Sequence, residues 1–342
     1  MISQKKVPAL PPSVSFEGKT ALVTGANRGL GFATCQQLVE RNVSKLVLAV
    51  RTLSTGEEAK EALLSQASKQ GHALEVIVKQ LDMASEKSVI ALVDSLSSEG
   101  IVLHLAILNA AISLMKWTTS PETQNEMQFQ VNYLSTVLLS LLLLPLLQPL
   151  SPQERCQLCI VGSQGYQLTP WNKKKTPSSI FSIFKDKAQF DPATRYSSTK
   201  YFLFLFTRRL ASQLPARYPH IQVYNTCPGF VKTTILDNLP WYYTKPLKML
   251  LVFVGRKEVE GGRLLAFAAS GELGDKASGE MVADMKVLPY VSSDPDQENG
   301  LMLTKWVIGR CHVQRRRKGT KWRICCGKKP WKRLKLLNLD RW

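Results

Sequence analysis

The sequence predicts an α/β fold in which a doubly wound parallel sheet carries helices on both faces. Short runs rich in Val, Ile and Leu alternate with longer helical segments along the 342 residues, and a glycine-rich loop at residues 24–31 follows the first run. Short apolar runs between helices are typical of strands buried on both faces of a parallel sheet, joined by right-handed crossovers. A chain of this length can bury a substantial core, so we expect one large domain.

The first half of the chain alternates strictly between strand and helix. Each short apolar run is interpreted as a strand, and each longer segment between two runs as a helix. In chain order the elements are strand Thr20–Val23, helix Gly31–Arg41, strand Lys45–Val50, helix Thr55–Lys69, strand Leu74–Leu81, helix Ser85–Ser98 and strand Leu103–Leu108.

The second half begins with a long helix, expected from Pro121 to Leu147. Its apolar part, Val137 to Leu147, is interrupted by Ser140 and Pro145 and is shorter than the about 20 residues that span a bilayer. A buried helix packed on the sheet is therefore expected. The later elements are strand Gln157–Val161, helix Ala193–Gln213, strand Ile221–Asn225 and helix Val259–Ala269.

The net charge of +19 is unevenly distributed. Thirteen Lys or Arg and one acidic residue lie in residues 310–342, so this segment carries +12 and the rest of the chain +7. We expect an N-terminal extension at 1–18, the main α/β domain at 19–300 and a basic, Trp-containing extension at 301–342. That extension is interpreted as a disordered tail or a gene-model artefact in preference to a specific nucleic-acid or anionic-membrane binder.

Cysteine and histidine spacing gives no support for a metal site. Cys156 and Cys159 form a C-x-x-C inside an expected strand, where their side chains would point to opposite faces, and the four histidines are scattered. The start of the chain lacks the apolar stretch of a signal peptide. We expect reduced thiols in a cytoplasmic protein, and association with a membrane surface stays open.

The glycine-rich loop, Thr24–Gly31, is suited to a dinucleotide. Gly25 allows a tight turn after the strand, and Gly29 and Gly31 let the backbone approach a pyrophosphate. Free N–H groups and the helix dipole favour phosphate at the start of the following helix. The loop therefore predicts a dinucleotide site.

The spacing T-G-x-x-x-G-x-G resembles that of the short-chain dehydrogenase/reductase family, and further motifs follow in the family's order between residues 19 and 285. Leu108–Ala111 is similar to the family's N-N-A-G with two departures, and Pro228–Thr233 is similar to P-G-x-V-x-T. Because Ala111 replaces a glycine, the turn after that strand is expected to differ if it needs a left-handed residue. The resemblance implies a Rossmann-type fold.

The same resemblance implies a set of cofactor-binding residues. Asp82 would contact the adenine, Asn109 the ribose side, and Val231 and Thr233 the nicotinamide carboxamide. The full set is Gly25, Asn27, Arg28, Gly29, Leu30, Gly31, Arg51, Asp82, Asn109, Tyr196, Lys200, Val231 and Thr233.

Charge at the end of the second expected strand favours NADP(H) over NAD(H). An acidic residue there would bind the ribose hydroxyls and repel a 2′-phosphate, but this chain has Val50 followed by Arg51. Arg28 in the glycine loop adds a second guanidinium, and such groups bind phosphate by charge-assisted hydrogen bonds. The alternative is that both arginines are ordinary surface residues.

Four residues are predicted to be catalytic. Tyr196 and Lys200, four apart, would share one helix face, so the ammonium would lower the phenol pKa and Tyr196 would donate the proton in carbonyl reduction. Ser163, after the fifth strand, would donate to the substrate oxygen. By resemblance, Asn132 holds a water in a proton relay; its alternative is a helix-surface asparagine.

Two segments bear on the substrate. The insertion Thr169–Thr194 resembles that of retinol-dehydrogenase-like and protochlorophyllide-reductase-like members. It is interpreted either as a flap beside the substrate or as a surface loop with incidental apolar residues. The apolar stretch 239–254 would close over a hydrophobic terpenoid, steroid, retinoid or polyketide-like compound, rest on a membrane or pack on the core. Both resemble fungal-type reductases of secondary metabolism.

The sequence thus predicts an NADP(H)-dependent reductase acting on a hydrophobic carbonyl or alcohol, with no specific nucleic-acid partner. Substrate identity, direction of the reaction and oligomeric state stay open. Two rival hypotheses are a non-catalytic NADP-binding sensor on the same scaffold and a tail-mediated nucleic-acid or membrane-surface binder.

Overall fold

One sheet organises the described part of the chain, which in this computed structural model comprises residues 4, 6–172, 180–232, 255–288, 313–315 and 322–324. The strand order is β3-β2-β1-β4-β5-β6-β7-β8, and all neighbours pair in parallel except β7 and β8. The strands are β1 (Thr20–Thr24), β2 (Lys45–Val50), β3 (Glu75–Gln80), β4 (Leu105–Leu108), β5 (Cys156–Val161), β6 (Ile221–Cys227), β7 (Met281–Ala283) and β8 (Lys286–Leu288). The strand order reverses direction between β1 and β4, and in such sheets ligands bind beside that point, beyond the carboxyl ends of the strands.

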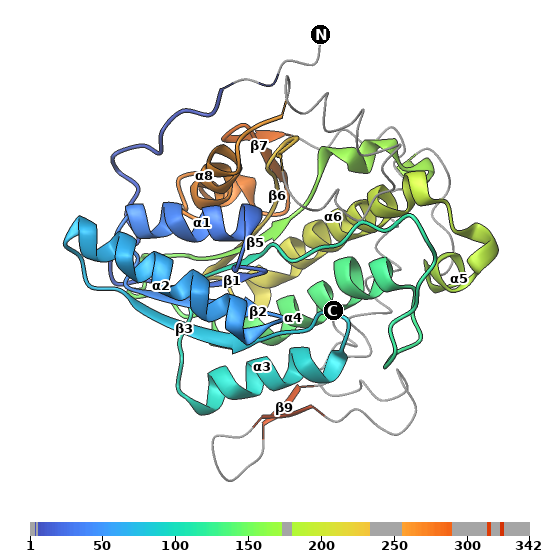
Figure 1. The fold of residues 1–342 in the computed structure, drawn as a ribbon, viewed down its shortest axis with the longest axis horizontal. Coiled ribbons are helices and arrows are strands. Elements are labelled where there is room, and N and C mark those ends of the chain that lie inside the picture. The colour runs from blue at the N-terminus through green and yellow to red at the C-terminus, as the bar shows by residue number, and fades with distance from the viewer. Residues whose placement is uncertain are drawn as a thin grey trace.

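Helices cover both faces of the sheet, as the sequence predicts. The α-helices are α1 (Gly29–Glu40), α2 (Leu53–Gln70), α3 (Glu86–Ser98), α4 (Ser135–Leu143), α5 (Ile180–Lys185), α6 (Pro192–Arg217) and α8 (Glu258–Ala268). Short 3₁₀ turns lie at Leu144–Leu146, Gln164–Leu168, Pro170–Asn172, Lys187–Gln189 and Asp275–Ala277. Helices α1, α2 and α8 lie on one side and α3, α4 and α6 on the other (Figure 1).

Neighbouring residues of each central strand enter different cores. In β1, Leu22 packs with the α3–α4–α6 side and Val23 with the α1–α2–α8 side. Cys156 and Cys159 separate in the same way, so the C-x-x-C thiols do point to opposite faces. Burial on both sides explains why the strands are almost uniformly apolar.

The predicted helix Pro121–Leu147 is wrong over its first six residues. Residues 121–126 form a turn in which Gln124 has φ of +58°, and the helical stretch starts at Met127. The buried Glu126 carboxylate accepts hydrogen bonds from the N–H groups of Gln128 (3.1 Å) and Phe129 (2.9 Å), which fixes the helix start there. The stretch then continues as a π-helix, Phe129–Leu134, before α4.

The apolar segment Phe129–Leu146 is long enough to cross a membrane by length and composition, with a mean hydropathy of 1.6. However, 78% of this segment is buried inside the protein. Leu139 and Leu143 are completely buried in the core on the α3–α6 side. The segment is a core helix, as the sequence predicts.

Helix α6 begins at a strong local signal. Pro192 occupies its first turn, and the Asp191 carboxylate accepts hydrogen bonds from the Ala193 N–H (3.0 Å) and the Thr194 hydroxyl (2.6 Å). Proline at this position and aspartate as cap are typical of helix starts. The helix runs four residues beyond its predicted end, to Arg217.

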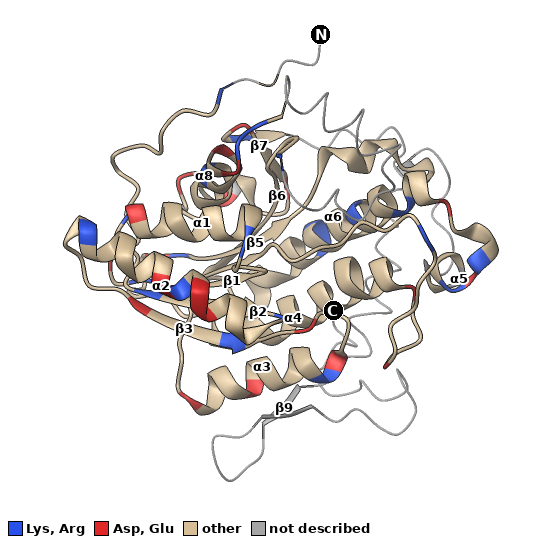
Figure 2. Ribbon diagram, viewed as in Figure 1, with Lys and Arg blue, Asp and Glu red and all other residues tan. Residues whose placement is uncertain are grey.

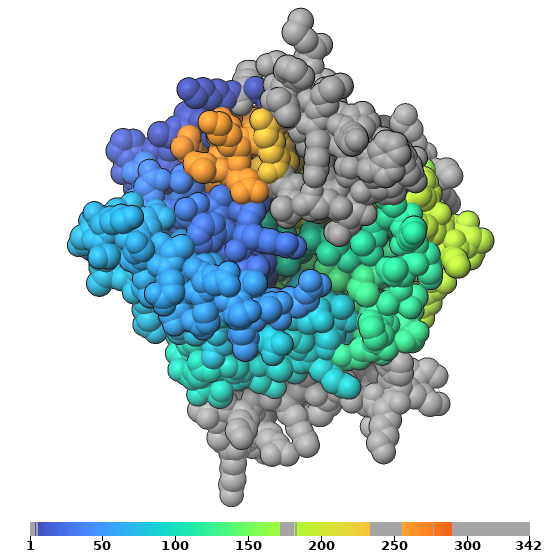
Figure 3. Space-filling view, viewed as in Figure 1, coloured from blue at the N-terminus to red at the C-terminus, as the bar shows by residue number. Residues whose placement is uncertain are grey.

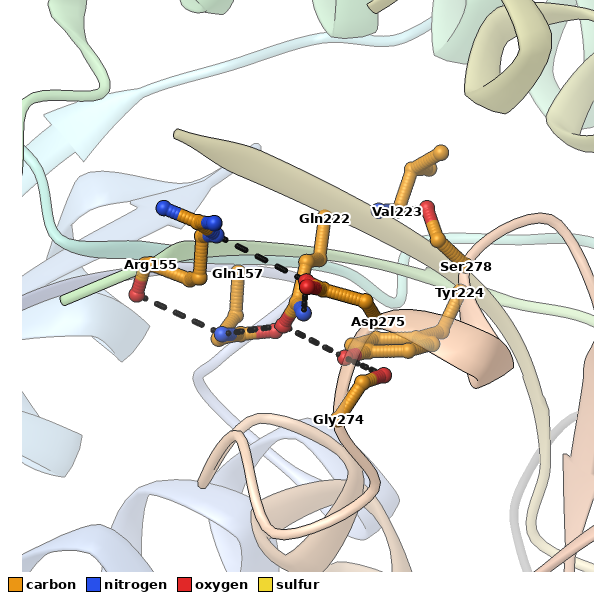
Figure 4. Close-up of polar contacts among 8 residues, drawn as sticks. All are labelled: Arg155, Gln157, Gln222, Val223, Tyr224, Gly274, Asp275 and Ser278. Atoms are coloured by element: carbon orange, nitrogen blue, oxygen red, sulfur yellow. Dashed lines mark hydrogen bonds and ion pairs between the residues drawn. The ribbon is translucent and has the colours of Figure 1, made fainter. Parts of the chain in front are cut away.

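A polar network joins β5 and β6 near their amino ends, away from the carboxyl ends of the strands (Figure 4). Gln222 accepts hydrogen bonds from Gln157 Nε2 (2.9 Å) and the Tyr224 hydroxyl (2.7 Å), and it donates to Asp275 (2.5 Å). Arg155 lies 3.5 Å from the same aspartate. The network ties the segment after α8 to the base of the sheet.

Residues 6–18 pack on the α1–α8 side of the domain. Leu10, Val14 and Phe16 are at most 4% exposed and join that core. Figure 3 shows the surface of α8 lying directly against that of α1.

Near the other end of the chain, β9 (Val313–Arg315) and β10 (Trp322–Ile324) pair only with each other among the described strands.

Acidic and basic residues are interspersed over α2 and α3 (Figure 2). The domain bounds 1–18, 19–300 and 301–342 stay a prediction.

Candidate active site

The glycine-rich loop forms a tight turn between β1 and α1 that only glycine fits. Gly25 and Gly29 have φ of +65° and +58°. A Cβ on Gly31 would lie 2.2 Å from the Gly25 carbonyl oxygen. No side chain caps α1 at Arg28, so the N–H groups of its first turn remain for an anion. The cradle fits the pyrophosphate of a dinucleotide.

Asn109 braces this loop from the end of β4. Its Nδ2 donates to the Thr24 carbonyl (3.0 Å), and the Ala110 N–H donates to the Thr24 hydroxyl (2.9 Å). Ala111 is not among the described residues with positive φ, so the alanine meets no left-handed turn. The departure from the family's glycine therefore does not disturb this segment.

Several predicted cofactor residues have structural contacts of their own. Asn27 Nδ2 donates to the Thr55 hydroxyl at the start of α2 (3.0 Å), and Asp82 Oδ1 accepts from the Ala84 N–H (2.9 Å). Val231 is buried and bridges to Arg256. Leu30 packs beside Gly261 of α8. Thr233 and the segment 239–254 lie outside the described residues.

Arg28 and Arg51 are both exposed, whereas Val50, at the end of β2, is 1% exposed. Among the described residues, neither arginine forms an ion pair with a carboxylate within 4.0 Å. Glu258 Oε1 would lie 3.5 Å from a Cβ added to Gly29, and burial raises the pKa of this carboxyl.

Tyr196 and Lys200 lie on one face of α6, at the carboxyl end of β5. Lys200 Nζ is 5.6 Å from the centroid of the Tyr196 ring and donates to the carbonyl oxygen of Val161, the last residue of β5 (2.7 Å). Ser163 follows two residues later, and its Oγ accepts a hydrogen bond from the Gly165 N–H (3.1 Å). The structure thus brings Tyr196, Lys200 and the Ser163 strand end together.

The electrostatics differ from the prediction that Lys200 lowers the phenol pKa. Burial raises the pKa of Tyr196, and Cys227 adds to the shift. Burial lowers the pKa of Lys200 to about 8, an effect that Cys227 opposes. In this structure loss of water is the largest cause of both pKa shifts. The Lys200 ammonium donates its hydrogen bond to the Val161 carbonyl.

Asn132 is completely buried, so it is not a helix-surface residue. Its Oδ1 accepts from the Ile112 N–H (2.9 Å), while Nδ2 donates to the Ile112 carbonyl (2.9 Å) and the Thr199 hydroxyl (3.2 Å). It lies in the π-helix, a distortion often found at functional sites. Asn132 therefore ties the segment after β4 to α6, one residue before Lys200.

Three apolar residues of the insertion belong to the core. Phe181, Ile183 and Phe184 are at most 8% exposed, and Phe184 stacks on Phe129 with ring centroids 4.2 Å apart. They are therefore not an incidental surface cluster.

Arg195, directly before Tyr196, was missed by sequence reasoning. Its guanidinium carbon lies 4.7 Å from the Phe184 ring centroid and 5.2 Å from that of Phe190, and Nη2 donates to the Gln189 carbonyl (2.7 Å). These contacts hold the insertion against the start of α6.

Cys227 was also missed. This thiol is 3% exposed, and its sulfur accepts hydrogen bonds from the N–H groups of Gln164 (3.2 Å) and Gly229 (3.4 Å). It thereby links the segment after Ser163 to the segment after β6. Its position directly before Pro228-Gly229 was the available sequence signal.

Comparison with known proteins identifies the family. The family model described as short chain dehydrogenase matches residues 19–169. A short chain dehydrogenase of Arthrobotrys oligospora is 34% identical over 290 residues, covering 83% of this chain and 88% of that protein. The short chain dehydrogenase opdN of Penicillium oxalicum is 36% identical over 298 residues, covering 83% and 92%.

A solved structure, the RhlG/NADP active-site complex of Pseudomonas aeruginosa, has a similar fold. The TM-score is 0.58 at 21% identity, and the match covers 80% of this chain and 97% of that one. From its relatives and its fold, the chain belongs to the short-chain dehydrogenase/reductase family, whose members are oxidoreductases that use NAD(P).

Proposed function

We propose that the protein is an NADP(H)-dependent oxidoreductase that reduces a ketone or aldehyde, or oxidises the corresponding alcohol, on a hydrophobic small molecule. The observation that carries this proposal is the placement of Tyr196 and Lys200 on one face of α6, with Lys200 hydrogen-bonded to the end of β5 and Ser163 just beyond. Parallel sheets of this kind bind ligands beyond the carboxyl ends of their strands.

The roles of the side chains follow from their chemistry. When bound, the nicotinamide ring supplies or accepts hydride. In reduction, the Tyr196 hydroxyl gives its proton to the substrate oxygen, and its raised pKa keeps that proton in place until transfer. The Lys200 ammonium stabilises the phenolate left behind. Ser163 donates a hydrogen bond to the same substrate oxygen as negative charge develops on it.

Asn132 is proposed to support this arrangement through its bonds to Ile112 and Thr199, which fix the Lys200 turn of α6. The relay water of the family would lie beyond this amide. The glycine cradle, Asp82 and Asn109 are proposed to bind the pyrophosphate and adenosine half of the cofactor.

The preference for NADP(H) is supported by the apolar Val50 at the end of β2 and the two exposed arginines, Arg28 and Arg51. A carboxylate at the end of this strand would repel the 2′-phosphate, and none is present. Guanidinium groups bind phosphate by paired, charge-assisted hydrogen bonds.

A hydrophobic substrate is supported by exposed apolar side chains near the catalytic residues in sequence. Leu168, five residues after Ser163, is 75% exposed, and Phe230, beside Val231, is 57% exposed. The fungal origin of the relatives, together with the insertion, supports a role in fungal secondary metabolism.

The direct test is oxidation of NADPH and NADH with a panel of hydrophobic ketones. We expect turnover with NADPH and a strong preference over NADH. Replacing either Arg28 or Arg51 by serine should lower the NADPH preference by about tenfold to a hundredfold, because a charge-assisted bond contributes about 1.5–3 kcal/mol. NADPH binding without turnover on any ketone would instead support the sensor hypothesis.

A further inference from the structure

The segment that follows β6, residues 228–232, is held from outside by residues distant in sequence. We call it the post-β6 loop. Its central residue, Phe230, donates its N–H to Gln4 Oε1 (2.8 Å), and its carbonyl accepts from Gln4 Nε2 (2.9 Å) and from the Arg256 N–H (2.8 Å). The Lys232 N–H donates to the Arg256 carbonyl (3.0 Å). The loop backbone is thus bound on two sides.

Arg256 grips the loop from the α8 side. The residue is 5% exposed, its Nη1 donates to the Pro228 carbonyl (3.1 Å), and its Nη2 pairs with the Asp284 carboxylate. A buried cation is costly unless it is paired and hydrogen-bonded. Its contacts with this loop and with Asp284 therefore fix the guanidinium in one position.

Gln4 grips the loop from the N-terminal segment. Its side-chain amide both donates to and accepts from Phe230, which reproduces the pair of hydrogen bonds that a neighbouring strand would make. Val7 anchors the segment by burial at 3% exposure, and Arg263 Nη1 donates to the Val7 carbonyl (3.2 Å). The buried Val7 therefore fixes the position of the segment that carries the Gln4 side-chain amide.

The side chains of Gln4 and Arg256 both lie close to Gly229. This residue has φ of +79°, and an added Cβ would lie 2.3 Å from Gln4 Oε1 and 2.4 Å from Arg256 Nη1. We call the contacts of Gln4 and Arg256 with the post-β6 loop the clamp. The clamp requires a glycine at position 229, because the backbone there is left-handed. On the inner side, the Gly229 N–H donates to Cys227 Sγ (3.4 Å).

We propose that Arg256 and Gln4 are positioning residues that hold the post-β6 loop in the conformation that binds the nicotinamide carboxamide. This inference rests on the proposed function and on the contact with the nicotinamide carboxamide that the family resemblance implies for Val231. Loosening the clamp should weaken binding of the nicotinamide half of the cofactor. Binding of the adenosine half, which involves the glycine cradle and the end of β2, should not change.

The experiment compares two ligands on the full-length chain. NADPH carries the nicotinamide, and adenosine 2′,5′-bisphosphate carries only the adenosine phosphate half. The variants are Gln4→Ala and Arg256→Met. Gln66→Ala is the matched control for the first, because Gln66 also bonds a distant backbone carbonyl, that of Gln36 (3.0 Å). Arg155→Met, which removes the ion pair with Asp275, is the control for the second.

We expect Gln4→Ala to raise the Kd for NADPH by about threefold to tenfold, as the loss of one or two partly exposed hydrogen bonds implies. Arg256→Met should raise it by about tenfold or more, because a charged donor is lost. The Kd for adenosine 2′,5′-bisphosphate should stay at the wild-type value in both, and both controls should match wild type with both ligands.

Unchanged NADPH affinity in Gln4→Ala would overturn the inference, as would equal weakening of both ligands. If Arg256→Met does not fold, Gln4→Ala decides alone, because Gln4 lies outside the two buried cores. Failure of the wild-type protein to bind NADPH would overturn the proposed function and this inference with it.

Discussion

Lys200 is a buried cation whose environment sets its proton affinity. Its side chain is almost completely inaccessible, and burial lowers its pKa to about 8. The hydrogen bond to the Val161 carbonyl fixes the amine 5.6 Å from the Tyr196 ring centroid. The residue best placed to stabilise a tyrosinate therefore loses its charge under mildly alkaline conditions.

This leads to a prediction for the pH dependence of ketone reduction. As the pH rises past about 8, Lys200 becomes neutral, while the raised pKa keeps Tyr196 protonated. The value of kcat/KM for the ketone at saturating NADPH should therefore fall on the alkaline side, with an apparent pKa near 8.

Lys200→Arg is the informative comparison, because its guanidinium stays charged. Its residual activity should decline only at higher pH. An alkaline limb at the same pH in both proteins would show that another group controls it.

At the scale of elements, α1 and α8 pack closely through a glycine. A Cβ on Gly262 would lie 2.6 Å from the carbonyl carbon of Ala33 and 2.7 Å from the Thr34 nitrogen. These are backbone atoms of α1, the helix whose first turn forms the phosphate cradle. The spacing of the two helices therefore supports the cofactor site.

Gly262→Ala should destabilise the protein by about 1–3 kcal/mol, because the two helices must separate. On helix propensity alone the same change would stabilise it by up to about 1 kcal/mol, so the sign is diagnostic. Denaturant unfolding measures the difference. Val259→Ala, at a 43% exposed position of the same helix, serves as control. A Gly262→Ala protein as stable as wild type would contradict the close packing.

Elements and site residues were predictable to different extents. Strands β1 to β6 and the catalytic helix α6 are close to their predicted positions, because local apolar runs and the Asp191-Pro192 start signal specify them. Strands β7 and β8, three residues each, carry too little pattern to be detected. The start of the Asn132 helix depends on Glu126 and a left-handed Gln124, which periodicity does not reveal.

The site shows the same division. The glycine cradle and the Tyr196–Lys200 pair are local in sequence and were predicted. Arg256 and Gln4 act through contacts between distant segments, which no motif encodes. The sequence signal for Cys227 was only its position directly before Pro228-Gly229. The pKa directions also required the structure, because burial rather than sequence distance controls them.

At the scale of the whole molecule, the two ends of the central strands have different roles. The carboxyl ends of β1, β4, β5 and β6 lead, in that order, into the glycine-rich loop, Asn109, Ser163 and the post-β6 loop. Near the amino ends of β5 and β6 lies the polar network around Gln222, which is 5% exposed (Figure 4). A substitution in this network should therefore lower the free energy of unfolding and leave kcat/KM unchanged.

Gln222→Leu should lower the free energy of unfolding by about 2 kcal/mol or more, because Gln157 and Tyr224 lose their common acceptor. The value of kcat/KM at a temperature where the variant is folded should equal that of wild type. Gln148→Leu, an exposed position, should change neither quantity. A Gln222→Leu protein with wild-type stability but reduced kcat/KM would contradict this separation.

The central claim is that the Tyr196 hydroxyl protonates the substrate oxygen. The most direct measurement is the rate of NADPH-dependent ketone reduction by Tyr196→Phe, together with its Kd for NADPH. We predict a kcat at least about a hundredfold lower, with NADPH affinity near the wild-type value, because only the proton donor is removed. A variant that binds NADPH and keeps most of the wild-type kcat would contradict the claim.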